Sequence, residues 1–302
     1  MKIDGLKAFA EERKIKYGEN EAMSLHTSFK IGGGADIFLR PQTVEELVSI
    51  ISEAKREEIP VFILGSGSNL IVSDEGIEGA VISTAGLSDL ILVDENTIYA
   101  QAGASLAALC CFARDNGLTG LEFAYGIPGS VGGAVYMNAG AYGGDISGVI
   151  LSAESLDASG ERVVRDAEEL GLGYRKSIFK ENGETVIGAT FRLEKGKSEE
   201  IASAMTEIIG KRKKSQPLEY PSAGSTFKRP EGYFAAALID ECGLKGRAVG
   251  GAMVSEKHAG FVINHSGATC RDVLGLIEVI KQTVKAQKGV DLETEIIFVG
   301  RS

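Results

Sequence analysis

The sequence contains few cysteines and histidines, and their spacing excludes a metal centre and a disulfide framework. Four Cys and three His occur in 302 residues. No two cysteines form C-x-x-C, and the histidines have no metal-ligand spacing with one another or with cysteine. We therefore expect reduced thiols and no metal. The residues concerned are Cys110, Cys111, Cys242, Cys270, His26, His258 and His265.

Long apolar runs are also absent. No stretch approaches the roughly 18 apolar residues of a membrane-spanning helix. Residues 1–18 are charged throughout and have no apolar core, so they do not form a signal peptide. Together with the sparse cysteines, this predicts a cytoplasmic protein without membrane insertion.

Basic charge is scarce. The net charge is −10 and the isoelectric point about 5.0. The dense basic run at residues 211–214 is typical of a solvated helix end, where cations also suit the helix dipole. We therefore expect no nucleic-acid partner, because such a partner requires a basic face.

Glycine, in contrast, is concentrated in two places. Residues 122–144 contain seven glycines in 23 positions and no Lys or Arg. A shorter loop, GSGSN at 65–69, follows the apolar run 60–64. Glycine permits close backbone approach, and exposed N–H groups bind phosphate. The two loops indicate a diphosphate held mainly by backbone. Ordinary tight turns would account for the short loop but explain the long block poorly.

Neither loop matches the common nucleotide motifs. The Rossmann pattern requires a third glycine, and Leu70 stands at that position after Gly65 and Gly67. The P-loop requires a glycine five residues before Gly196-Lys197-Ser198, where the chain has Phe191. The diphosphate must therefore be held by another arrangement.

Length, hydrophobic periodicity and a shift in composition predict an α+β chain of two domains, the first at 1–196 and the second at 197–302. Thr43 and Glu46 form a capping-box pattern before an amphipathic helix at 43–58. A polar stretch at 194–200 resembles a linker. Further predicted helices lie at 104–116, 199–214, 233–241 and 270–288. Predicted strands lie at 35–40, 61–64, 80–84, 97–103, 149–157, 161–165, 186–193, 260–264 and 294–299.

Several motifs, in one order along the chain, resemble the UDP-N-acetylenolpyruvoylglucosamine reductase (MurB) family. They are GSGSN at 65–69, IPGSVGGAVYMNAGAYG at 127–143, GYRKS at 173–177 with Phe179, SAGSTFK at 222–228, KHAGFVIN at 257–264 and LETEI at 292–296. The resemblance runs from about Thr27 onward, and the chain is similar to the shorter of the family's two subtypes. Contacts made by the longer subtype's inserted loop are not carried over.

The resemblance implies an FAD-binding fold of two α/β subdomains that sandwich the flavin, with the split between them near 85–90. A smaller C-terminal α/β substrate domain follows. It further implies reduction of the enolpyruvyl ether of UDP-N-acetylglucosamine to UDP-N-acetylmuramate with NADPH, a step in peptidoglycan precursor synthesis. The first glycine loop has no histidine, so we expect FAD to be bound non-covalently. We expect the UDP-sugar and NADPH as partners and a monomeric protein.

The resemblance also assigns roles to residues. Arg175 would stabilise the substrate enolate, with Glu295 either protonated or orienting a donor, and Ser225 would donate the proton. Taken alone, Arg175 would be a surface residue, Glu295 an outward residue of an edge strand and Ser225 a turn residue. Substrate-binding candidates are Tyr174, Arg229 and Lys257. Cofactor-binding candidates are Gly65, Ser66, Gly67, Ser68, Asn69, Gly126, Pro128, Gly129, Ser130, Gly132, Gly133, Asn138 and Ile187.

Two other functions remain open from the sequence. One is another FAD-dependent oxidoreductase of the same fold, acting on an alcohol or a sugar. The other is a nucleotide-binding regulator without catalysis. The first would share the glycine loops but lack the set Arg175, Ser225 and Glu295, and the second would not oxidise NADPH.

Overall fold

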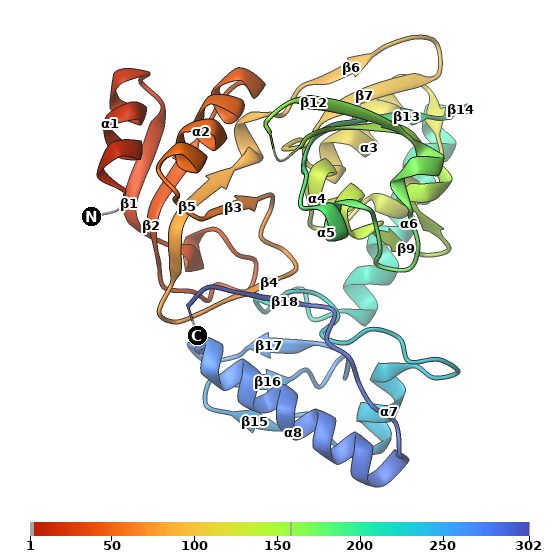
Figure 1. Ribbon diagram of the computed structural model, residues 1–302. Coiled ribbons are helices and arrows are strands. Elements are labelled where there is room, and N and C mark those ends of the chain that lie inside the picture. Colours follow the sequence, from red (N-terminus) through yellow and green to blue (C-terminus); the bar gives the residue numbers. More distant parts are fainter. Residues whose placement is uncertain (1–2, 158, 302) are drawn as a thin grey trace. The chain divides into compact units, whose positions relative to one another are not determined.

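The computed structural model of the protein describes residues 3–157 and 159–301 (Figure 1). The chain forms two compact units, and both are discontinuous in sequence. The first contains Met1–Gly18, Ile37–Ser66 and Gly79–Arg212, and the second contains Glu19–Asp36, Gly67–Glu78 and Lys213–Ser302. Helices and strands are mixed in each, which confirms the α+β prediction.

One sheet has the strand order β1-β2-β5-β3, and the boundaries between the units fall within its first three strands. Strands β3 and β5 are parallel, with Val61 opposite Ala80. The sheet follows helix α1 (Asp4–Glu12) along the chain, and helix α2 (Val44–Arg56) joins β2 to β3. The strands are β1 (Lys16–Ala22), β2 (Gly34–Arg40), β3 (Val61–Leu64) and β5 (Ile77–Ser83).

The capping box predicted before α2 is only half formed, which corrects the sequence-based prediction. The Thr43 hydroxyl accepts a hydrogen bond from the Glu46 N–H at 3.1 Å, as an N-cap should. The Glu46 carboxylate, however, accepts from the N–H of Gln42, one residue earlier, at 2.7 Å. The Glu46 carboxylate thus satisfies the N–H group of Gln42, which precedes the helix, instead of the N–H group of the N-cap residue Thr43.

The largest sheet of the first unit has the order β12-β11-β13-β7-β6 and antiparallel pairing. The predicted hairpin before residue 166 is confirmed as β11 and β12, with Leu156 opposite Arg162. The strands are β6 (Leu90–Leu92), β7 (Thr97–Gln101), β11 (Ile150–Leu156), β12 (Arg162–Asp166) and β13 (Thr185–Arg192).

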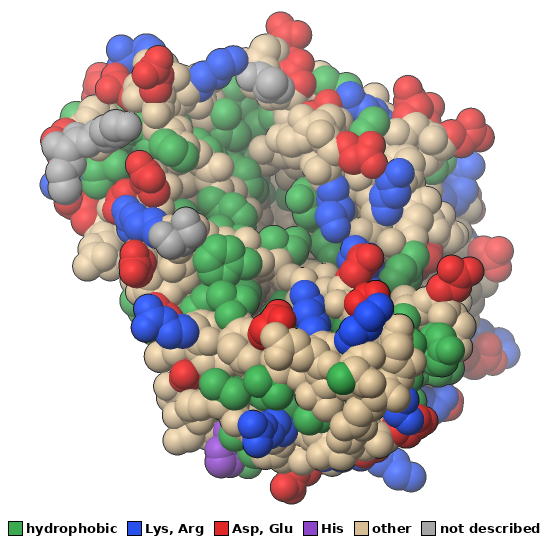
Figure 2. Space-filling view, turned by 60° about the horizontal axis from the view of Figure 1, so that its bottom comes forward, with side chains coloured by type: hydrophobic (Ala, Val, Ile, Leu, Met, Phe, Trp, Pro, Cys, Tyr) green, Lys and Arg blue, Asp and Glu red, His purple; other side chains and the backbone are tan. Residues whose placement is uncertain are grey.

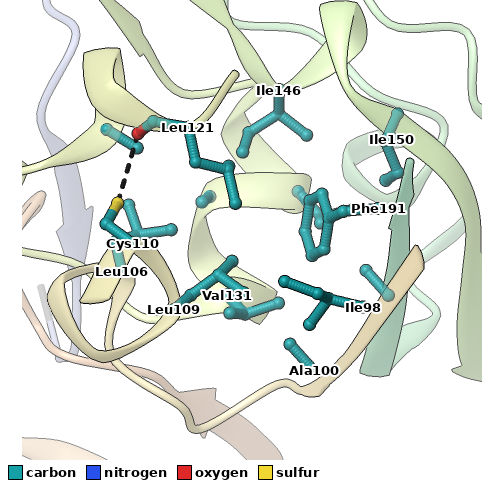
Figure 3. Packing of buried hydrophobic residues seen from close by; sticks show 14 of the residues in the cluster. Ile98, Ala100, Leu106, Leu109, Cys110, Leu121, Val131, Ile146, Ile150 and Phe191 are labelled. Atoms are coloured by element: carbon teal, nitrogen blue, oxygen red, sulfur yellow. Dashed lines mark hydrogen bonds between the residues drawn. The ribbon is translucent and has the colours of Figure 1, made fainter. Parts of the chain in front are cut away.

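The core beneath this sheet holds the glycine block in place (Figure 3). Val131, the first residue of helix α4 (Val131–Met137), is fully buried there with Ile98 and Phe191. Helix α3 (Leu106–Asp115) contributes Leu109 and Cys110, whose thiol donates to the Leu121 carbonyl at 3.2 Å. Apolar packing against the core therefore fixes the position of the glycine block.

The stretch predicted as a linker is partly regular structure, so that prediction was wrong. Strand β14 (Glu194–Lys195) pairs with β8 (Leu118–Thr119), and helix α6 (Ser198–Ser215) begins three residues later. The segment is polar because Glu194 and Lys195 are exposed to solvent on a two-stranded sheet. Ile201 and Met205 of α6 are buried in the core of the first unit.

The basic run at 211–214 contains a second correction. Arg212 is not solvated, because only 8% of its surface is exposed, whereas Lys211, Lys213 and Lys214 are exposed. Isoleucines and methionine at helical spacing place one face of α6 against the core, and Arg212 falls on that face.

In the second unit, helix α8 (Cys270–Lys288) matches the predicted range. Helix α7 (Ala235–Glu241) precedes a sheet of order β15-β16-β17, made of β15 (Ala248–Val249), β16 (Ala252–Val254) and β17 (Val262–Asn264). Strand β18 (Ile297–Val299) pairs in parallel with β4 (Leu70–Val72). The predicted strand at 294–299 starts late, because Thr294 and Glu295 pair with another segment, described below.

Short elements complete the described chain. They are the strands β9 (Gly140–Ala141) and β10 (Gly144–Asp145), the helix α5 (Phe179–Asn182) and the 3-10 turns at Met23–Leu25, Thr84–Gly86, Glu122–Ala124, Ile146–Gly148 and Ala167–Leu170. Lys and Arg side chains are intermixed with Asp and Glu side chains on the face shown in Figure 2. No helix among the described residues is long and apolar enough to cross a membrane.

A complete capping box starts α8, and its loss should be measurable. The Thr269 hydroxyl accepts from the Asp272 N–H at 3.1 Å, and the Asp272 carboxylate accepts from the Thr269 N–H at 3.0 Å. We expect Thr269→Ala to lower the free energy of unfolding by about 1 kcal/mol, since an N-cap acceptor is lost. Urea unfolding followed by circular dichroism measures this. Thr283→Ala, within the same helix, is the control and should change stability by less; equal effects would contradict the capping argument.

Candidate functional site

The two glycine loops meet in the first unit. A Cβ added to Gly65 would lie 2.4 Å from the Ser130 hydroxyl oxygen, so only glycine allows the approach. A Cβ on Gly132 would lie 2.8 Å from the Cβ of Ala102. Ile187 joins the same cluster, because its carbonyl accepts from the Ala102 N–H at 2.9 Å. These cofactor-binding candidates are therefore brought together.

The start of helix α4 is already hydrogen-bonded within the protein. The N–H groups of Val131 and Gly132 donate to the carbonyls of Ala104 and Ala102, both at 2.8 Å. The Ser130 hydroxyl caps the helix by accepting from the Gly133 N–H at 3.4 Å. Gly129 uses its carbonyl, which accepts from the Leu106 N–H at 2.9 Å. Pro128 is exposed at the tip of this loop.

The GSGSN loop has a different character. No described residue accepts a hydrogen bond from the N–H groups of Ser66, Gly67 or Ser68. Gly67 has φ +60°, and a Cβ there would lie 2.1 Å from the carbonyl oxygen of His26. Three successive N–H groups on a glycine-bearing turn are the kind of backbone donors that bind phosphate.

Arg175 occupies a tight turn in a strained backbone conformation. Gly173 and Lys176 exchange two N–H···O hydrogen bonds of 3.1 Å, so Tyr174 and Arg175 form the tip between them. Arg175 has φ +54°, which few non-glycine residues adopt. Tyr174 is 58% exposed, and its ring centroid lies 5.2 Å from the guanidinium carbon. Backbone strain of this kind is common at functional sites, where it holds a side chain in a particular orientation.

Asn138 holds this turn, a role that the sequence did not reveal. It ends helix α4 in the left-handed conformation with φ +42° and is 2% exposed. Its amide donates to the Gly173 carbonyl at 3.0 Å and its oxygen accepts from the Ser147 N–H at 3.0 Å. The Arg175 guanidinium lies 3.5 Å from the Asn138 carbonyl and 3.4 Å from the Gly140 carbonyl. An Asn at the end of a helix is a sequence signal for such a left-handed cap.

Ser225 and Glu295 lie on paired segments of the second unit. Phe227 pairs with Thr294, and the Glu295 N–H donates to the Thr226 carbonyl at 2.9 Å. Thr226 and Phe227 are buried, while Ser225 is exposed and Glu295 half-buried. The fold therefore anchors the segment through its neighbours and leaves the serine accessible.

Asn69 joins this pairing from the first glycine loop. Its side-chain amide donates to the Glu295 carbonyl at 3.2 Å, and its own carbonyl accepts from the Ile297 N–H at 3.0 Å. The second unit thus holds part of the GSGSN loop beside the segment that carries Glu295.

The substrate-binding candidates have internal contacts. The Lys257 ammonium donates to the Lys213 carbonyl at 2.8 Å and lies 3.7 Å from a Glu219 carboxylate oxygen. The guanidinium carbon of the exposed Arg229 stands 4.3 Å from the centroid of the Phe234 ring. His258 packs edge-on against Phe261, and burial lowers the pKa of this histidine.

The glycine loops fit a flavin nucleotide, and comparison with known proteins identifies the class. A family model described as an FAD binding domain matches residues 35–165. It spans the GSGSN loop, helix α4 and the β11–β12 hairpin. This part of the chain is therefore an FAD-binding domain.

A second family model, described as the UDP-N-acetylenolpyruvoylglucosamine reductase C-terminal domain, matches residues 216–299. The chain is 50% identical to the Clostridium novyi protein of that name over 295 residues, 98% of this chain and 95% of the relative. It is 48% identical to the Caldanaerobacter subterraneus protein of that name over 298 residues, 99% and 98% of the two chains. The chain belongs to the UDP-N-acetylenolpyruvoylglucosamine reductase family.

The fold agrees with this assignment. The crystal structure of UDP-N-acetylenolpyruvylglucosamine reductase from Thermus caldophilus matches with a TM-score of 0.80 and 36% sequence identity. The match covers 94% of this chain and 98% of that one. The family prediction made from the sequence motifs is confirmed.

Proposed function

We propose that this chain reduces the enolpyruvyl ether of UDP-N-acetylglucosamine to UDP-N-acetylmuramate with NADPH, as a step in peptidoglycan precursor synthesis. Bound FAD supplies the redox chemistry, and the protein supplies position, charge and a proton. The observation that carries the proposal is the Arg175 turn, held in a strained conformation by Asn138, in a chain of this family.

Reduction of the enolpyruvyl group places negative charge beside a carboxylate and then requires a proton. Arg175 stabilises that charge, because a guanidinium forks onto carboxylate oxygens and stays protonated. Ser225 donates the proton to the carbon next to the carboxylate. Glu295 acts in its protonated form or orients a donor, since a charged carboxylate would repel the enolate. Tyr174, Arg229 and Lys257 contact the substrate.

The same proposal assigns the cofactor loops. Ser66, Gly67 and Ser68 offer their backbone N–H groups to the FAD diphosphate, supported by their lack of described acceptors. Gly126, Pro128, Gly129, Gly132 and Gly133 border the flavin, with Gly65, Ser130 and Ile187 shaping that region. Asn69 and Asn138 contact the cofactor from the first glycine loop and from the end of helix α4.

We propose two functional domains. Residues 1–196 bind FAD, and residues 197–302 bind the substrate. Two hydrophobic clusters support the internal split near 85–90. One is built mainly from residues 3–87 and the other from residues 98–205. We also propose a monomer in the cytoplasm, where the four unpaired cysteines would stay reduced.

An anaerobic assay tests the function and separates it from the two alternatives. NADPH should bleach the flavin absorbance, and the enolpyruvyl sugar nucleotide should restore it. Bleaching of the flavin by an alcohol or a sugar in the absence of NADPH would instead favour another oxidoreductase of this fold. Absence of bleaching would favour a non-catalytic binder.

Purified protein should be yellow, and acid precipitation should release all of its flavin into the supernatant. The physical reason is that the GSGSN loop offers no histidine for a covalent bond. Absorbance of supernatant and pellet measures the outcome. Flavin retained in the pellet would refute non-covalent binding, and a colourless protein that FAD cannot reconstitute would refute the cofactor assignment.

A further inference from the structure

Arg212 is a buried cation with an unsatisfied donor. It lies near the end of helix α6, and 8% of its surface is exposed. Its Nε has no hydrogen-bond acceptor among the described residues. Burying an ion without a partner costs several kcal/mol in general, so such groups are rare unless something pairs with them.

No carboxylate among the described residues pairs with Arg212. The nearby ionisable side chain that influences it is Tyr142, a phenol. Burial lowers the pKa of the Arg212 guanidinium, and the interaction with Tyr142 opposes this shift. An arginine nevertheless remains protonated in proteins. A positive charge is therefore kept inside the first unit without a fixed anion beside it.

Arg212 lies against the glycine block. A Cβ on Gly126 would be 3.1 Å from Cδ and 3.6 Å from Nε of Arg212, and Gly126 has φ +90°. Tyr142, at the other end of the block, has φ +53°. The Gly140 carbonyl, which accepts from Arg175, is two residues before Tyr142. The side chains of Arg212 and Arg175 thus both lie next to backbone of the glycine block.

We propose that Arg212 binds an anionic group, a phosphate or carboxylate, of a ligand held at the glycine block. This rests on the proposed function, which supplies two sources of that chemistry. One is FAD with its diphosphate, and the other is the substrate with its diphosphate and carboxylate. The planar fork of arginine suits both groups, and a buried, preformed cation is less hydrated than a surface lysine.

Arg212→Met tests the proposal through binding as well as stability. The variant removes the charge and keeps an apolar stem, so ligand-free protein should melt at the same temperature as the wild type or higher. One titration adds FAD to apoprotein and follows flavin fluorescence. The other adds the enolpyruvyl substrate to oxidised holoenzyme and follows the flavin spectrum. We expect Kd to rise roughly 10- to 100-fold in one titration, the scale of a hydrogen bond to a charged group.

The outcomes identify the source of the anion. Weakened FAD binding alone assigns Arg212 to the cofactor, and weakened substrate binding alone assigns it to the substrate. Wild-type affinity in both titrations overturns the proposal, as does a lower melting temperature of the ligand-free variant with unchanged affinities. Arg212→Gln replaces Arg212→Met if the latter does not fold.

Two controls distinguish a failure of this inference from a failure of the proposed function. Lys214→Met removes an exposed cation of the same helix and should leave both Kd values within about twofold, because exposed charges contribute little. The wild-type protein itself reports on the proposed function. If it binds FAD and turns over the substrate while Arg212→Met binds both normally, only the inference about Arg212 fails.

Discussion

Ser225→Ala is expected to slow one stage of the reaction and spare the other. If Ser225 only donates a proton to the substrate, bleaching of the flavin by NADPH does not need it. Recovery of the absorbance on adding the enolpyruvyl substrate should fall by roughly 10²-fold or more, the usual effect of removing a general acid. Stopped-flow absorbance follows both stages separately.

The structure makes this substitution interpretable. Ser225 is exposed, while the neighbouring Thr226 and Phe227 are buried and fix the backbone. Loss of the hydroxyl should therefore leave the fold intact. Ser225→Cys should retain part of the activity, because a thiol is also a proton donor. Equal slowing of both stages by alanine would mean that Ser225 shapes the pocket, and no slowing would remove it from the reaction.

Arg175→Lys should also cause a large loss in the substrate-dependent stage, on the order of 10²-fold. Lysine keeps the positive charge but loses the fork that contacts two carboxylate oxygens at once. Arginine and lysine have a similar energetic cost in the left-handed conformation at φ +54°, so the substitution should preserve the turn. Stopped-flow measurement of absorbance recovery gives the rate, and flavin fluorescence gives the FAD affinity, which should not change.

Lys176→Met is the matched control for Arg175. Lys176 is the next cation on the turn, is exposed, and pairs with Glu181 at 3.1 Å. Its loss should change the substrate-dependent rate by less than about twofold, since exposed ion pairs contribute little. An unaffected rate in Arg175→Lys, or an equal loss in Lys176→Met, would contradict the assignment of Arg175.

Regular elements with strong local signals could be predicted from the sequence. Helix α8 has a Thr269 cap, an apolar stripe and Gly289 at its end, and its range was predicted correctly. Strand β3 was predicted correctly because Pro60 and Gly65 bound a short apolar run. In both, the information lies within a few neighbouring residues.

Features set by distant contacts could not be predicted. Helix α4 lies within a glycine-rich block, and burial of Val131 in the core overrides the poor helix propensity of Gly132 and Gly133. The burial of Arg212 depends on packing against Gly126, far away in sequence. Motif resemblance indicated Ser225 and Glu295, but the hydrogen bond from the Glu295 N–H to Thr226, the neighbour of Ser225, appears only in the folded chain.

The pairing of β4 with β18 constrains the order in which the protein can fold. Asn69 bonds to the backbone of Glu295, which is 226 positions later in the sequence. Arg301 similarly donates to the Glu75 carbonyl and to the Asp36 carboxylate. Chains are made from the N-terminus, so the first glycine loop must wait for residues near 295–301 before its backbone partners exist. Until then this segment is an unpaired strand edge, and nascent chains lacking those residues should need protection from aggregation.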